Sequence, residues 1–230
     1  MFQATGTRTL LAIWILGTLM AFPCFASLSN YNPLGMPVGS TYTIVYATID
    51  YVNGESSEIS TFNNLVMADV DAFLPAEAST LSWCAVVSTS TVNAVDNCGQ
   101  NANAGGAIYN LYDSSEVADS FSDFTSQPLL NAVTQYDGGS GRFVWTGSTA
   151  GGVASANPLG STEVTIGTTI AGIPNGFDLG LNNDTSYNNL YAMAEITVEA
   201  PEPASLSLIV AGAMGLLFAT SARRTSRRPS

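Results

Sequence analysis

Carboxylates are the side chains of this sequence that could do chemistry, because most other reactive types are missing. The 230-residue chain has 18 Asp or Glu residues, no His, and no Lys. A nucleophilic Ser or Cys needs a neighbouring base, and neither His nor Lys is present to serve as one. Glycoside hydrolysis needs only two carboxylates at a suitable separation. A secreted glycoside hydrolase is therefore an alternative, although no particular catalytic pair can be named.

Four oxygen-bearing side chains lie close together in the last third of the chain. They are Asp178, Asn182, Asn183 and Asp184. Carboxylate and amide oxygens are ligands that calcium prefers, but the spacing is not that of an EF-hand loop. A polar loop without an ion explains the same residues and is the interpretation we favour. Calcium is an alternative on these residues, and no other cofactor is indicated.

Cys84 and Cys98 are predicted to form a disulfide. Thirteen residues separate them, and closing such a loop contributes about 3 kcal/mol in the chain-entropy model. Two thiols without His fall short of the four ligands of a structural zinc site. Trp83 precedes the first of these cysteines, so we expect it to pack against the disulfide.

The charge of the body excludes whole classes of partner. Between residues 27 and 200 there are 17 Asp or Glu, since Glu202 is the eighteenth, and Arg142 is the only cation. A formal charge of −16 repels nucleic acids and anionic lipids, which are bound through Lys and Arg. Neutral or cationic partners remain: sugars, divalent ions, or other copies of the chain.

The body, residues 27–199, is predicted to be an all-β domain. Thr, Val, Ile and Tyr carry its apolar positions, and Gly, Asn, Asp and Pro separate the runs. Asn53-Gly54 indicates a tight hairpin between the first two runs, and Ser114–Phe124 has the spacing of a short amphipathic helix. We predict an antiparallel, jelly-roll-like β-sandwich with that one helix, and a core that holds Phe143 and Trp145. The expected strands are 41–52, 55–66, 81–92, 107–112, 142–146, 163–170 and 190–199.

The N-terminal segment has the pattern of a signal peptide. Arg8 precedes an uncharged apolar run over residues 10–22, and small residues suit cleavage by signal peptidase after Ala26. Residues 1–26 are therefore predicted to direct export, which places the two body cysteines in an oxidising compartment.

The C-terminal segment has the pattern of a membrane anchor. Residues 204–222 are nineteen uncharged, mostly apolar positions, or about 28 Å of helix, close to one hydrocarbon core. Positive flanks stay on the cytoplasmic side, so the body is expected to lie outside. The flank consists of Arg223, Arg224, Arg227 and Arg228.

Residues 200–230 as a whole resemble a PEP-CTERM sorting signal. Pro201-Glu202-Pro203 stands directly before the apolar span, and the Arg-rich tail follows it. The resemblance implies recognition by an exosortase, which acts near the Pro-Glu-Pro region in Gram-negative bacteria that make exopolysaccharide. It also implies an inner-membrane precursor and a product in the periplasm, on the outer surface or in the extracellular matrix.

The sequence thus predicts an exported, non-enzymatic surface or matrix protein. Signal peptidase and an exosortase are its expected processing partners, and exopolysaccharide or biofilm is its expected association. One alternative is a carbohydrate-binding module, with or without calcium, and the other is the glycoside hydrolase named above.

Overall fold

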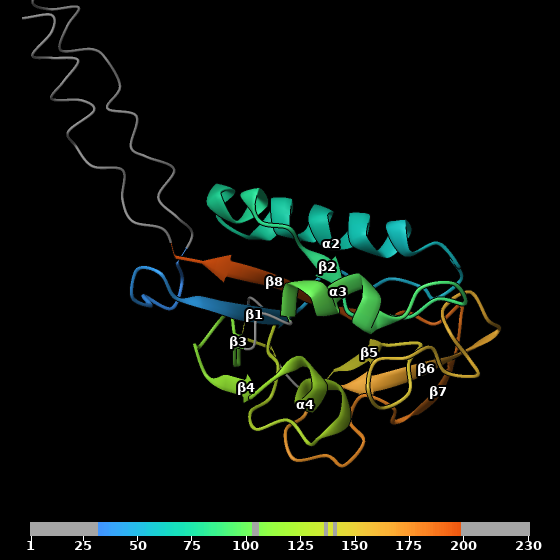
Figure 1. Cartoon of the computed structure of the whole chain (residues 1–230). Coiled ribbons are helices and arrows are strands. Elements are labelled where there is room, and N and C mark those ends of the chain that lie inside the picture. Colours follow the sequence, from blue (N-terminus) through green and yellow to red (C-terminus); the bar gives the residue numbers. More distant parts are fainter. Residues whose placement is uncertain (1–31, 103–105, 136–137, 140–141, 199–230) are drawn as a thin grey trace, which may run out of the picture. The chain divides into compact units, whose positions relative to one another are not determined.

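One mixed β-sheet of eight strands organises the part of the chain that the structure describes (Figure 1). The computed structural model of the chain describes residues 32–102, 106–135, 138–139 and 142–198. The strand order is β4-β3-β1-β8-β5-β6-β7, and β2 also pairs with β8. The strands are β1 (Thr41–Ala47), β2 (Cys84–Ala85), β3 (Ile108–Asn110), β4 (Glu116–Ala118), β5 (Phe143–Trp145), β6 (Glu163–Thr168), β7 (Gly180–Asn183) and β8 (Asn189–Thr197).

The last strand, β8, lies at the centre of the sheet. On one side it is antiparallel to β1, from the pair Thr41 and Thr197 to the pair Ala47 and Tyr191. On its other side β8 runs parallel to β5 and then antiparallel to β2. The first and last strands are thus direct neighbours, and every other strand of the sheet is built outward from this pair.

Helices cover both faces of the sheet (Figure 1). Helix α2 (Ile59–Phe73) and the 3₁₀ helix η1 (Ala76–Thr80) pack on one face, while α3 (Ala94–Ala102) and α4 (Phe121–Ser126) pack on the other. Successive side chains of a strand point to opposite faces. In β1, Ile44 and Tyr46 therefore join the core under α2, whereas Val45 joins the core under α3 and α4.

The prediction of a strand over residues 55–66 is wrong, because α2 begins at Ile59. Phe62, Val66 and Val70 are all buried, and their spacing of four residues matches one face of a helix. In the sequence Asn63 and Asn64 interrupt this helical pattern, and its apolar positions are partly β-branched, which favours a strand. The helix ends at Phe73, because Pro75 holds the preceding Leu74 in an extended conformation.

The β-rich character is confirmed, but the antiparallel two-sheet sandwich is not what forms. The described residues make a single sheet, and two of its pairings, β1 with β3 and β5 with β8, are parallel. Parallel neighbours require long connections: the one from β1 to β3 carries α2, η1, β2 and α3, and the one from β5 to β8 carries β6 and β7. No hairpin forms at Gly54, which instead lies so close to the core that an added Cβ would meet Val164 at 3.2 Å.

The helix predicted over Ser114–Phe124 is correct only in its last part. Residues 116–118 form β4, and α4 starts at Phe121. Ser120 caps this helix by accepting a hydrogen bond from the Asp123 N–H at 3.1 Å. The strand comes first because Val117 and Ala118 are buried beside β3.

Side-chain amides and the disulfide close the outer edge of β2. The Ala85 N–H donates to Asn63 Oδ1 at 2.9 Å, and Asn97 Nδ2 donates to the Ala85 carbonyl at 2.8 Å. The sulfur atoms of Cys84 and Cys98 are 2.14 Å apart, so the predicted disulfide is confirmed. Two asparagines from α2 and α3 thus take the place of a neighbouring strand, and the disulfide holds α3 against the same edge.

We expect Phe62→Ala to lower the free energy of unfolding by about 3 to 5 kcal/mol, because it empties a buried site under α2. The matched control is Asn64→Ala, whose exposed side chain should change stability by less than about 0.5 kcal/mol. Urea denaturation measures both. A strand would place residues 62 and 64 on one face, so equal losses from the two variants would contradict the helix.

Candidate functional site

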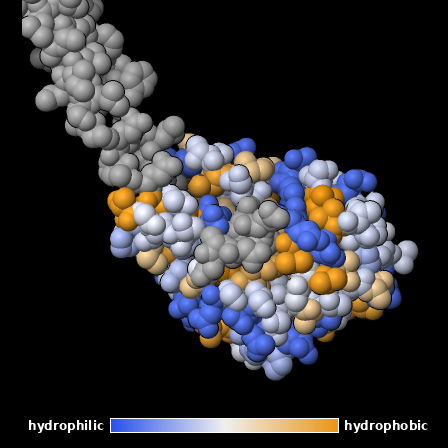
Figure 2. Space-filling model, viewed as in Figure 1, coloured by the Kyte–Doolittle hydropathy of each residue, from blue (hydrophilic) through white to orange (hydrophobic). Residues whose placement is uncertain are grey.

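Several carboxylates of the body act in local turns and helix caps. Asp113 Oδ1 accepts from the Ser115 N–H at 3.0 Å, Asp123 from the Ser120 hydroxyl at 2.6 Å, and Asp96 from Asn93 Nδ2 at 2.7 Å. On the face drawn in Figure 2, hydrophobic residues form small islands among hydrophilic ones. These contacts give the acidic residues a structural and solubilising task, and they assign no catalytic pair.

Asp69 is the only buried carboxylate among the described residues, with 2% of its surface exposed. It lies on the face of α2 that packs on the sheet. It accepts hydrogen bonds from the Tyr46 hydroxyl at 3.0 Å and from the N–H groups of Ile49 and Asp50 at 2.9 and 3.0 Å. Burial raises the pKa of Asp69 above its usual value, although the three donors act in the opposite direction.

The contacts of Asp69 make it a structural residue. Its oxygens bind the segment that follows β1 to α2, so they satisfy two backbone N–H groups that would otherwise lack partners. Asp69 is not among the candidate residues predicted from the sequence. An Asp directly before Val70, on the apolar face of a helical pattern, is the signal that could have found it.

The four calcium candidates are distributed along β7 and the turns beside it. Asn182 and Asn183 belong to the strand, while Asp178 and Asp184 flank it on opposite sides. The three steps of extended backbone from Gly180 to Asn183 alone span about 10 Å. The two carboxylates are thus attached at opposite ends of the strand.

The amide oxygens of these candidates already have partners. Asn182 Oδ1 accepts from the Ser186 hydroxyl at 3.1 Å, and Asn183 Oδ1 accepts from the Thr185 hydroxyl at 2.6 Å. Over the described ranges, no group of three or more His, Cys, Asp or Glu side chains could hold a metal ion. These contacts describe a polar turn after β7.

Both tryptophans of the body belong to the core. Trp145 is fully buried and donates to the Val52 carbonyl at 2.8 Å, and Trp83 donates to the Ala78 carbonyl at 2.9 Å. Trp83 packs edge-on against Tyr46 rather than against the disulfide, because adjacent residues of a strand face opposite ways. Phe143 shares the face of Trp145 as predicted, but it is 54% exposed at the start of β5.

The described part of the chain begins and ends at the same end of the sheet. The Gly39 N–H donates to the Val198 carbonyl at 2.7 Å, and the Val198 N–H donates to the Ser40 carbonyl at 2.8 Å. In the sequence only Glu199 and Ala200 stand between this contact and Pro201. A cut in the Pro-Glu-Pro region would therefore fall within a few residues of β8.

The predicted processing and topology residues lie outside the described residues. They are Ala26, Pro201, Glu202, Pro203, Arg223, Arg224, Arg227 and Arg228. The apolar span predicted over residues 204–222 also lies outside the described residues. Among the helices that the structure describes within 32–198, none is long and apolar enough to cross a membrane.

Comparison with known proteins gives no assignment. No model of a protein family matches the chain, and no curated protein matches it either. Function has to be inferred from the chemistry of the residues themselves.

We expect Asp69→Ala to lower the free energy of unfolding by about 3 kcal/mol, because it removes the side-chain acceptor of the Ile49 and Asp50 N–H groups and the hydrogen bond from Tyr46. Asp69→Asn keeps the shape and one acceptor oxygen, so its loss should be near 1 kcal/mol. Thermal or urea unfolding measures the difference. Equal losses would show that the acceptor oxygen kept by Asn contributes nothing, which would contradict the hydrogen-bonding role of Asp69.

The raised pKa of Asp69 also predicts a pH effect. A folded-state pKa above the unfolded value means that the folded protein binds the proton more tightly. The contribution of Asp69 to the free energy of unfolding therefore increases as the pH falls from neutral through its folded pKa, and levels off below its unfolded pKa. Unfolding measured across this range should show the wild type gaining stability relative to Asp69→Asn. A difference in the free energy of unfolding between the wild type and Asp69→Asn that stays constant with pH would contradict the raised pKa.

Proposed function

We propose that this chain is an exported, non-enzymatic surface or matrix protein of a Gram-negative bacterium. Signal peptidase cuts after Ala26, the span over residues 204–222 holds the precursor in the inner membrane, and an exosortase cuts near Pro201-Glu202-Pro203. The observation that carries the proposal is the order of tripeptide, apolar span and Arg-rich tail directly after the last strand.

Two features of the fold support this proposal. The disulfide between Cys84 and Cys98 suits an oxidising compartment, as export requires. Both chain connections leave from the end of the sheet at Gly39 and Val198, so removal of either terminal segment leaves the sheet itself unbroken.

The processed protein is associated with exopolysaccharide or biofilm in this proposal. A carbohydrate-binding module is the second candidate, and exposed aromatic residues favour it, as argued below. Calcium dependence at Asp178, Asn182, Asn183 and Asp184 is part of that second candidate. A glycoside hydrolase stays an alternative without an assigned pair of carboxylates.

The sorting proposal predicts that Pro-Glu-Pro at 201–203 is needed for release from the inner membrane. Replacing all three residues with Ala should leave the C-terminal tail attached and the protein in the inner membrane. The wild type should have the mass of residues 27 to about 201 and lie outside that membrane. Intact mass and cell fractionation in the native host measure both properties.

The controls separate the enzyme from the anchor. Deletion of the exosortase gene should reproduce the triple-Ala result, whereas Ala replacements at Ser226 and Ser230 in the tail should leave processing unchanged. A wild-type chain that keeps its tail in the inner membrane in hosts with and without the exosortase would refute sorting and indicate an ordinary membrane anchor.

A further inference from the structure

Exposed aromatic side chains gather at one end of the sheet. The exposed fractions are 45% for Tyr51, 54% for Tyr112, 54% for Phe143 and 66% for Tyr187. Among the described residues the only other exposed aromatic side chain is Phe73, at 37%. We call the four residues Tyr51, Tyr112, Phe143 and Tyr187 the aromatic arc.

The strand register brings these residues together from four separate segments. Val52 pairs with Asn188, which places Tyr51 and Tyr187 beside the same bridge. Val144 pairs with Asn189, so Phe143 lies beside the start of β8. Tyr112 follows β3, which runs parallel to β1, and therefore lies near the end of β1 from which Tyr51 continues.

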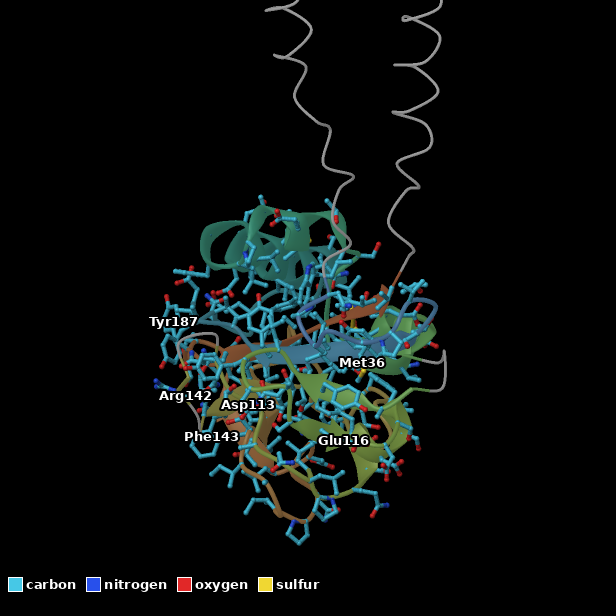
Figure 3. The ribbon with its side chains drawn as sticks, turned by 90° about the vertical axis from the view of Figure 1, so that its left-hand side faces the viewer. Met36, Asp113, Glu116, Arg142, Phe143 and Tyr187 are labelled. Atoms are coloured by element: carbon cyan, nitrogen blue, oxygen red, sulfur yellow. A yellow bond between two sulfur atoms is a disulfide. The ribbon has the colours of Figure 1, made fainter. Side chains whose placement is uncertain are left out.

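Arg142, the single cation of the body, lies within the arc. Its guanidinium carbon is 5.6 Å from the centroid of the Tyr51 ring, and its Nη1 donates a hydrogen bond to the Tyr51 hydroxyl. Figure 3 shows Tyr187, Arg142 and Phe143 along one side of the unit, with Asp113 beside them in this view and Met36 away from them. The guanidinium thus fixes one ring of the arc and leaves further N–H donors for a ligand.

We propose that the aromatic arc binds a neutral polysaccharide, with pyranose rings stacked on the tyrosine faces and hydroxyls bonded to Arg142 and the tyrosine hydroxyls. Aromatic rings of this kind offer a large apolar face with a polar tip. Sugar rings present the complementary combination of apolar C–H faces and hydroxyl edges. Binding of a glycan outside the cell is also part of the proposed function, but binding at the aromatic arc does not require processing by an exosortase.

The charge of the chain decides against an acidic polysaccharide. The body carries 17 carboxylates against Arg142 alone. A polyuronate would approach a surface of its own sign, and the repulsion acts within a Debye length of about 8 Å at physiological salt. A neutral glycan meets no such barrier.

The groups of the arc suit a sugar ring. Stacking uses the aromatic faces, and the hydroxyl edges of the sugar meet the tyrosine hydroxyls and Arg142. Tyr and Arg are also enriched in protein interfaces, so the glycan gels below separate the two kinds of partner: a surface that binds only protein gives no retardation.

The position of the arc suits a surface protein. Tyr51 follows the end of β1 and Tyr187 precedes β8, whereas the chain connections lie at Thr41 and Thr197. The six steps of β1 separate the two ends of the sheet by about 20 Å. The arc therefore faces away from the end at which the chain would be anchored.

Affinity electrophoresis of the full-length chain in gels containing hydroxyethyl cellulose, laminarin or galactomannan tests the proposal, with alginate as the acidic comparison. At least one neutral glycan should retard the protein. Tyr51→Ala and Tyr187→Ala should each weaken the apparent Kd about tenfold, as the loss of one stacked ring predicts. Tyr187→Phe should retain most of the binding, because the ring remains.

Phe73→Ala is the matched control, an exposed aromatic residue outside the arc, and it should leave binding unchanged. Circular dichroism verifies that each variant is folded. The proposal is overturned if no neutral glycan retards the protein, if alginate retards it most, or if Phe73→Ala weakens binding as much as Tyr187→Ala. Because the full-length chain is used, these results do not depend on whether the tail is ever cut.

Discussion

The antiparallel pairing of β1 with β8 is the interaction on which the rest of the structure depends. It joins the first and last strands over seven residue pairs at the centre of the sheet, with one core under α2 and the other under α3 and α4. Every strand between them in sequence adds to this pair or extends from it. The sheet cannot be completed until residues close to Thr197 are present, which ties folding to the arrival of the C-terminal part of the chain.

Local sequence pattern was enough for most strands and for the disulfide, but not for the way they are assembled. Six of the seven predicted strands overlap an observed one, because alternating or β-branched runs such as 41–52 and 163–170 report directly on the strand period. The short strands β4 and β7 were not predicted. The run 55–66 failed because burial at Phe62 and Val66 fits both periods, and only exposed Asn64 and buried Asp69 show that the period is that of a helix. Parallel pairing depends on crossovers between distant segments, and no local pattern encodes it.

The candidate sites also divide into features that the local sequence predicts and features that depend on the assembled fold. Burial of both tryptophans was predictable from their position in apolar runs, whereas the aromatic arc combines residues from 51 to 187 that become neighbours only through register. Arg142 was conspicuous in the sequence as an isolated cation, but its contact with Tyr51 required the fold. The acidic residues of the Asp178–Asp184 segment are close in sequence and separated in space, because an extended strand lies between them.

The placement of the chain connections has a mechanical consequence. If the arc is held by a glycan network through Tyr51 and the C-terminal end by the cell envelope, tension enters β1 at its Ala47 end and leaves β8 near Thr197. The two strands are then pulled in opposite directions along their length, so the hydrogen bonds between them are sheared together rather than opened in succession. Tension applied between the two chain ends would instead peel β1 from β8 one pair at a time. The direction of attachment therefore decides how firmly the domain resists extension.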